Sequence, residues 1–142
     1  MRRKGELTTI EKGRIGELAI YKHMVGLGYN IYTPIADVDH VDMVVELDNG
    51  VFSRVQIKTI TKTRFKTSIE VKLRKYSAGR IDVIGVYYAP KDIIAFVPFN
   101  GEDHFILAIA TAKNNQEENR KWIWQYEEFP EFIANKKYGK QK

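Results

Sequence analysis

Residues 35–59 read IADVDHVDMVVELDNGVFSRVQIKT and contain the strongest structural signal in the chain. Two apolar runs with alternating polarity, Val41–Leu47 and Val51–Thr59, are joined by Asp48, Asn49 and Gly50. Asn and Gly tolerate the positive φ angles that tight turns need, so this pattern predicts a β-hairpin.

Polar residues interrupt both strands of the predicted hairpin. Asp42 stands near the start of the first strand, and Gln56 and Lys58 are two residues apart in the second. Because side chains alternate along a strand, Gln56 and Lys58 leave the same face of the sheet. If the strands pair in simple register, Lys58 passes close to Asp42. An acid, an amide and an ammonium brought together on one face indicate a site rather than a core.

Length and composition limit the class of protein. The 142 residues, 44% of them hydrophobic, exclude a disordered chain. We expect one domain over residues 1–142, with basic, flexible ends at 1–7 and 135–142. The chain has no cysteine, which excludes disulfides and thiolate metal sites. No apolar run reaches the ~20 residues of a membrane helix, and the N-terminus lacks a signal-peptide core, so we expect a cytoplasmic protein without a membrane partner.

The net charge of +5 is unevenly distributed. Residues 54–80 hold nine Lys or Arg against one acid, whereas residues 36–48 hold five acids and no Lys or Arg. A basic field beside a compact acidic cluster is typical of a protein that binds a polyanion and places a divalent cation against it. The alternative is a solvated surface of ordinary ion pairs.

A helix is predicted before the hairpin, from Ile10 to Leu27. Thr8 or Thr9 caps it, and Gly28 is well placed as its left-handed C-terminal residue. The face expected to be buried comprises Leu18, Tyr21, Met24 and Val25. Glu17 lies at the edge of this face, where its carboxylate needs a partner, an ion or water unless it reaches solvent.

The remaining elements are predicted to be strands. They are expected at residues 29–33, 68–75, 81–88, 93–99 and 105–110, with either a strand at 122–126 or a short helix at 126–134. A polar loop is expected at 112–121. The predicted architecture is an α/β fold with an N-terminal helix followed by a mixed central sheet of six or seven strands.

The polar residues of the helix and hairpin suit phosphodiester hydrolysis, which needs a metal ion, an activated water and positive charge at the phosphate. Mg²⁺ favours one or two carboxylates and accepts carbonyl oxygens. Asp42, the Gln56 amide oxygen and the Ile57 backbone carbonyl are the expected ligands, and Mn²⁺ is expected to substitute for Mg²⁺. Glu17 could hold the ion or its water, and Lys58 would lie beside the attacking water.

These residues resemble the motif of the PD-(D/E)XK nuclease superfamily. Asp42 and Gln56-Ile57-Lys58 match its hairpin, and GRIGE at residues 13–17 matches its helical Glu. Val41 stands where the motif has Pro, and Gln56 where most members have Asp or Glu, which removes a charged ligand. The Gln is similar to that of small homing endonucleases encoded in group I introns. The resemblance covers roughly residues 11–99 and implies a restriction-endonuclease-like core.

Double-stranded DNA is the expected substrate. Seven basic residues are predicted to contact it: Lys62, Arg64, Lys66, Lys72, Arg74, Lys75 and Arg80. The strand at 68–75, with Lys72 and Arg74 pointing outward, is a candidate for the major groove. Because one active site cuts one strand, cleavage of both strands implies a homo-oligomer, a dimer or tetramer.

Three functions remain open from the sequence. The leading one is an Mg²⁺-dependent, sequence-specific DNA endonuclease of the intron-homing or phage type. The alternatives are a Holliday junction resolvase of the same fold and a DNA-binding module on a degenerate nuclease fold. Outside this set, Asp82 is expected to pair with Arg80 or a lysine rather than reach a metal, and His40 to face solvent.

Overall fold

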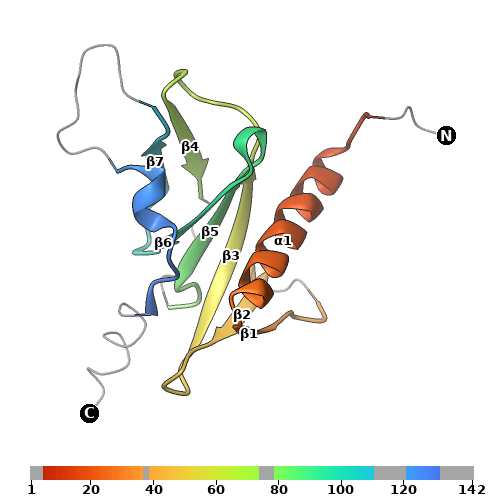
Figure 1. Ribbon diagram of the computed structural model, residues 1–142, viewed down its shortest axis with the longest axis vertical. Coiled ribbons are helices and arrows are strands. Elements are labelled where there is room, and N and C mark those ends of the chain that lie inside the picture. Colours follow the sequence, from red (N-terminus) through yellow and green to blue (C-terminus); the bar gives the residue numbers. More distant parts are fainter. Residues whose placement is uncertain (1–4, 37–38, 74–78, 111–120, 132–142) are drawn as a thin grey trace.

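The computed structural model describes residues 5–36, 39–73, 79–110 and 121–131 (Figure 1). The elements follow in the order α1 (Thr9–Gly26), β1 (Asn30–Tyr32), β2 (Met43–Glu46), β3 (Phe52–Ile60), β4 (Ser68–Lys72), β5 (Val83–Tyr88), the 3-10 helix η1 (Ala89–Lys91), β6 (Ile93–Pro98), β7 (His104–Ala108) and the 3-10 helix η2 (Ile123–Tyr126). Within these ranges, no helix combines the length and apolar character needed to cross a membrane. Arg74, Lys75, the loop residues 111–120 and the C-terminal residues 132–142 lie outside the described residues.

The predicted hairpin is confirmed, with β2 and β3 pairing antiparallel from Met43 opposite Val55 to Glu46 opposite Phe52. Its turn closes through a bond of 2.8 Å from the Leu47 amide to the Val51 carbonyl. Gly50 takes a φ of +77°, which a residue without a Cβ adopts at little cost. The local chemistry of the turn therefore sets the register of the whole hairpin.

Helix α1 begins and ends close to the predicted residues. Thr8 caps it: the Glu11 amide donates to Thr8 Oγ1 at 3.1 Å, and the Thr8 amide donates to Glu11 Oε1 at 2.9 Å. This reciprocal pair satisfies two amides that have no partner inside the helix. Leu27 caps the C-terminus and Gly28 follows with a φ of +92°, as expected.

The predicted buried face of α1 is wrong at two positions. Leu18 is 56% exposed and Val25 is 60% exposed. The residues that pack onto the sheet are instead Gly16, Ile20 and Met24. Apolar residues surround this helix, so their spacing does not single out one face. The small size of Gly16 decides which face can approach the sheet.

The seven strands form two sheets, not the single sheet expected from the sequence. The larger is mixed, in the order β1-β2-β3-β5-β6, with β3 and β5 parallel and the other pairs antiparallel. Strands β4 and β7 pair with each other in a separate antiparallel sheet. The residue patterns predicted the strands and the β2–β3 hairpin, but not the pairing of β4 with β7, because these two strands are distant in sequence.

Of the two alternatives for the C-terminal region, the strand at residues 122–126 is wrong, and the short helix at 126–134 extends beyond the described residues. Only Trp122 makes a bridge, to Ala108, and residues 123–126 form the 3-10 helix η2. The Trp122 amide donates to the side-chain oxygen of Gln125 at 3.0 Å, and the Gln125 amide donates to the Trp122 carbonyl at 3.0 Å. These two bonds favour a turn over an extended strand.

Two hydrophobic clusters lie on opposite faces of the five-stranded sheet. On one face, Ile20 and Met24 of α1 pack with Val55 and Ile57 of β3. The other cluster joins residues of β4 and β7 to β5, on the far face of the sheet from α1 (Figure 1). Gln56 pairs in register with Ile84 of β5, a member of this second cluster, so Gln56 leaves the face away from α1.

Candidate active site

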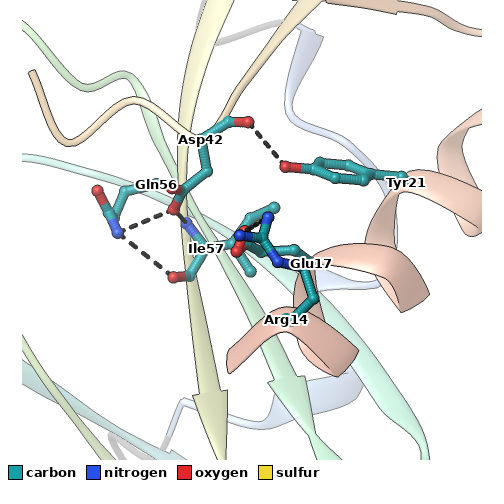
Figure 2. A network of polar contacts seen from close by, with 6 residues as sticks. All are labelled: Arg14, Glu17, Tyr21, Asp42, Gln56 and Ile57. Atoms are coloured by element: carbon teal, nitrogen blue, oxygen red, sulfur yellow. Dashed lines mark hydrogen bonds and ion pairs between the residues drawn. The ribbon is translucent and has the colours of Figure 1, made fainter. Parts of the chain in front are cut away.

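Asp42 stands immediately before β2 and is held by β3. Its backbone amide donates to the Val55 carbonyl at 2.8 Å. Its carboxylate oxygen Oδ2 accepts from the Ile57 amide at 2.8 Å and from Gln56 Nε2 at 2.9 Å (Figure 2). Hydrogen bonds to a charged acceptor are stronger than those between neutral groups. The hairpin therefore fixes the carboxylate against the middle of β3.

The Gln56 amide lies between two oxygens. Nε2 donates to Asp42 Oδ2 and makes a longer contact of 3.4 Å with the Ile57 carbonyl (Figure 2). The other end of the amide, Oε1, is buried and has no hydrogen-bond partner among the described residues. A buried polar atom without a partner costs about 1–3 kcal/mol, and Oε1 bears this cost in the orientation in which Nε2 faces Asp42.

These oxygens suit a hard divalent cation. A carboxylate, a backbone carbonyl and an amide oxygen are ligands that Mg²⁺ accepts, and the ion keeps several waters for its other positions. In the ranges that the structure describes, no three His, Cys, Asp or Glu side chains gather into a metal cluster. The residues present fit a cation held by Asp42, Gln56 and the Ile57 carbonyl, in which neutral oxygens replace additional carboxylates.

Helix α1 contributes three polar side chains beside Asp42. Arg14 Nη1 lies 3.4 Å from Glu17 Oε2, and the Tyr21 hydroxyl donates to the Asp42 carbonyl at 3.0 Å (Figure 2). The partner that the sequence required for Glu17 is therefore Arg14. A cleft of about 260 Å³ separates this side of the helix from the hairpin. Its lining is formed by Arg14, Glu17, Tyr21, Thr33, Pro34, Ile35, Val41 and Asp42.

Tyr21 was assigned to the core from the sequence, and its place beside Asp42 was missed. The available signal was its spacing, because Tyr21 follows Glu17 by four residues and shares its face of the helix. Burial raises the pKa of Tyr21 to about 12, and the negative charges of Glu17 and Asp42 act in the same direction. The phenol is therefore a neutral hydrogen-bond donor at physiological pH.

The raised pKa predicts how Tyr21 affects stability in alkali. Folding favours the neutral phenol of Tyr21, because its pKa is 10 in the unfolded chain and about 12 in the folded protein. The stability that this difference provides is fully present below pH 10 and is lost as the pH rises through about 12. Tyr21→Phe should therefore lose less stability than the wild type across this interval, measured by urea unfolding. Tyr29, whose pKa is also raised to about 12 by burial and by Glu131, provides a matched Tyr29→Phe comparison away from Asp42. An unchanged alkaline profile for Tyr21→Phe would contradict the assignment.

Lys58 lies on the same side of β3 as Gln56. It pairs in register with Val86, which belongs to the cluster on the face away from α1, and it is half-buried. Glu17 reaches the site from the α1 side of the sheet. The structure thus brings Asp42, Gln56 and Ile57 into direct contact and places Glu17 with Asp42 on one cleft. The close approach of Lys58 to Asp42 stays a prediction.

The basic residues predicted to contact DNA fall into three groups. Lys62 and Lys66, on the connector between β3 and β4, are exposed, as is Lys72 at the end of β4. Arg64, on the same connector, lies over the ring of Phe65, and its Nε is 4.0 Å from Glu70 Oε1. Arg80 forms an ion pair with Asp39. The structure does not describe Arg74 and Lys75.

Asp82 binds a residue that the sequence did not suggest as its partner, Arg54. Its Oδ2 accepts from the backbone amide of Arg54 at 2.8 Å and from Arg54 Nε at 3.2 Å. The parallel register of β3 and β5 brings these residues together across 28 positions of sequence, which spacing alone could not reveal. Asp82 thus binds β5 to β3, and the prediction that it is structural rather than a metal ligand stays consistent with this contact. His40 is exposed, as expected.

The sequence matches the PD-(D/E)XK endonuclease family over residues 7–129. Because the match spans most of the chain, the protein belongs to this family of nucleases, and the resemblance drawn from Asp42 and QIK is confirmed. Members of the family generally use divalent metal ions. No curated protein matches the chain.

Two solved structures share the architecture. The bacterial homing endonuclease I-Ssp6803I has a TM-score of 0.69 at 20% identity, covering 94% of this chain and 98% of its own. The Holliday junction resolvase Hjc of the archaeal hyperthermophile Archaeoglobus fulgidus has a TM-score of 0.51 at 10% identity, covering 87% and 96%. At these identities the likeness shows the fold alone, and it confirms a restriction-endonuclease-like core with an N-terminal helix and a mixed sheet.

Proposed function

We propose that the protein is a metal-dependent, sequence-specific DNA endonuclease of the intron-homing or phage type. The observation that carries the proposal is the convergence of two oxygens on the side chain of Gln56: Asp42 Oδ2 lies 2.9 Å from Gln56 Nε2, and the Ile57 carbonyl oxygen lies 3.4 Å from it. Membership of the nuclease family supports the reaction class. The choice of the homing type rests on the resemblance of the QIK hairpin and the GRIGE helix to that group.

The proposed cation is Mg²⁺, for which Mn²⁺ can substitute. Asp42, the Ile57 carbonyl and the Gln56 amide oxygen would hold it, and Glu17 would hold the ion or its water. A bound divalent cation supplies polarisation of the phosphate and a lowered pKa for an attacking water. With a single carboxylate in direct contact, the site carries less negative charge than an acidic cluster and accepts the phosphate more readily.

Lys58 and Arg14 have different roles in the proposed reaction. In hydrolysis, a water oxygen bonds to phosphorus and gives up a proton to solvent, the bond from phosphorus to one sugar oxygen breaks, and that sugar oxygen takes up a proton from solvent. We assign the Lys58 ammonium to the phosphate and attacking water, where it stabilises the negative charge that develops in the transition state. Arg14 neutralises Glu17 at 3.4 Å, which orients the carboxylate towards the cleft.

Exposed lysines on one connector suit the DNA backbone. Lys62 follows Lys58 by four residues, so their Cα atoms are at most roughly 13 Å apart, at about 3.3 Å per residue of extended chain. Lys62, Lys66 and Lys72 would then meet phosphates next to the cleaved one, and Arg64 and Arg80 would exchange their ion pairs for phosphate. Affinity from such contacts falls steeply with salt. Cutting both strands would require a homo-oligomer, a dimer or tetramer, acting on double-stranded DNA.

A second candidate function is Holliday junction resolution. The likeness to the Hjc resolvase fold favours it, although at a lower TM-score than the homing endonuclease. A third is DNA binding without cleavage, because Gln56 replaces the acid found in most PD-(D/E)XK motifs. The three differ in substrate and in dependence on metal, so one assay separates them.

The test is cleavage of supercoiled plasmid, a library containing the natural locus and a synthetic four-way junction, with Mg²⁺ or Mn²⁺. Lys58→Ala should lower the cleavage rate by roughly 10²–10³-fold, because it removes charge from the transition state. DNA binding, measured by gel shift with Ca²⁺, should persist. Lys121→Ala, an exposed lysine outside the proposed site, is the control for a simple loss of positive charge.

The substrate preference then decides the type of enzyme. Cutting of one sequence in the library supports the homing type, and cutting of the junction irrespective of sequence supports the resolvase. Binding without cleavage of any substrate would replace the enzyme with a DNA-binding module. A Lys58→Ala variant as active as the wild type would contradict the role proposed for that lysine.

A further inference from the structure

The orientation of the Gln56 amide is set by its surroundings. Two oxygens, Asp42 Oδ2 and the Ile57 carbonyl, lie at 2.9 and 3.4 Å from Nε2. Both are acceptors, so a nitrogen donor must face them when no cation is present. With Oε1 turned towards them, three oxygens would repel one another around an empty point.

This orientation has a cost at the other end of the amide. Oε1 is buried and unpaired among the described residues, while Asp42 Oδ2 accepts two hydrogen bonds, from Gln56 and from the Ile57 amide. A half-turn about the last side-chain bond exchanges the positions of Nε2 and Oε1. The same half-turn would remove one donor from Asp42 and bring a third oxygen to the position where the amide nitrogen now lies.

We propose that Gln56 is a two-position residue of the site. In the metal-free protein, Nε2 takes the place of the cation and holds Asp42; when a divalent cation enters, the amide turns and presents Oε1 instead. The second half of this inference rests on the proposed function, because it requires a cation at Asp42. The first half concerns the metal-free protein alone.

The inference explains what a glutamine provides here that a glutamate does not. A glutamate at position 56 would place a second carboxylate against Asp42, and two like charges in contact destabilise a fold that lacks a cation. The neutral amide can act as donor or acceptor, so the hairpin is stabilised in both states. Gln56 is thus a positioning residue for Asp42 before the metal binds and a ligand afterwards.

Nuclear magnetic resonance of the side-chain amide tests the two positions directly. The ¹⁵NH₂ signals absent from the spectrum of Gln56→Glu identify Gln56 in the wild type. After EDTA treatment, one proton of the pair should be protected from solvent exchange by its bond to Asp42. Saturating Mg²⁺ should shift both proton signals of this pair, because the nitrogen leaves Asp42 for the place that Oε1 now occupies. Signals that do not move when Mg²⁺ shifts the Asp42 backbone amide would overturn the inference.

Thermal unfolding in EDTA provides an independent test at neutral pH. Gln56→Glu should unfold about 5 °C below the wild type, and the added Asp42→Asn substitution should remove this deficit because it removes one of the two charges. A metal-free Gln56→Glu protein as stable as the wild type would overturn the role of the amide in holding Asp42. Neither measurement uses cleavage, so a protein that binds Mg²⁺ but cuts no DNA would refute the proposed function and leave this inference standing.

Discussion

Asp42→Asn is expected to lower the rate of metal-dependent cleavage by at least roughly 10³-fold while the hairpin keeps its register. Asparagine retains an oxygen that can accept from the Ile57 amide, the bond of 2.8 Å that ties Asp42 to β3. It loses the only carboxylate that contacts both Gln56 and Ile57 among the described residues. The change therefore removes the charge that attracts a cation and leaves most of the backbone pairing.

Asp48→Asn is the matched control. Asp48 is an exposed acid in the turn of the same hairpin, so the substitution has the same chemistry outside the site. Cleavage rate, thermal stability with and without Mg²⁺, and circular dichroism separate a loss of metal binding from a loss of fold. Mg²⁺ should raise the unfolding temperature of the wild type and of Asp48→Asn, but not of Asp42→Asn. An Asp42→Asn protein that keeps a tenth of the wild-type rate would exclude Asp42 as the principal ligand.

The sequence best predicted the features that are determined by residues close together in the chain. Asn49 and Gly50 determine a tight turn, so the sequence predicts that the hairpin brings Asp42 to β3. The neighbour expected for Asp42 in simple register is Lys58, whereas the contact with Gln56 depends on the observed register, in which Met43 pairs with Val55. The N-terminus of α1 is similarly local, because Thr8 and Glu11 cap it together. The helix and the hairpin carry the five residues that the sequence proposes for catalysis and metal binding, and their roles stay predictions: Glu17, Asp42, Gln56, Ile57 and Lys58.

Features that depend on distant residues were not predicted. Strands β4 and β7 form a sheet of their own because they pair with each other. A strand shows the same alternation of apolar and polar residues in either sheet, so the sequence pattern could not assign β4 and β7 to a second sheet. Arg54 meets Asp82 only because β3 and β5 are parallel. The position of Tyr21 also depends on a distant residue. Its aromatic ring indicated a core residue, but its hydroxyl donates a hydrogen bond to the Asp42 carbonyl, 21 residues away in sequence.

The contact between α1 and β3 depends on the absence of a side chain at Gly16. Gly16 is buried, and a Cβ added there would overlap Thr59 Oγ1 and lie 3.0 Å from Thr59 Cβ and 3.3 Å from Thr59 Cγ2. Since Thr59 is β-branched, rotation replaces one clashing atom with another. Any larger residue must therefore push the helix away from the sheet, and Glu17 and Tyr21 would move with it.

Gly16→Ala is accordingly expected to destabilise the protein by about 2–3 kcal/mol, measured by urea unfolding, because the helix cannot retain its packing. Gly13→Ala is the matched control in the same helix: no heavy atom lies within 4 Å of its added Cβ. There the gain in helix propensity should stabilise the protein by about 0.5–1 kcal/mol. Opposite signs from the same substitution three residues apart would show that contact with the sheet, not helix propensity, requires Gly16.

A double-mutant cycle assigns the clash to Thr59. Thr59→Ala removes Oγ1 and Cγ2 and leaves Cβ, so the double variant should recover part of the stability lost in Gly16→Ala. Thr59→Ala alone should cost little, because Oγ1 is buried without a hydrogen-bond partner in the part of the chain that the structure describes. Additive effects would contradict a direct clash. If part of the stability returns and cleavage returns with it, the distance between helix and sheet controls the site through Glu17 and Tyr21.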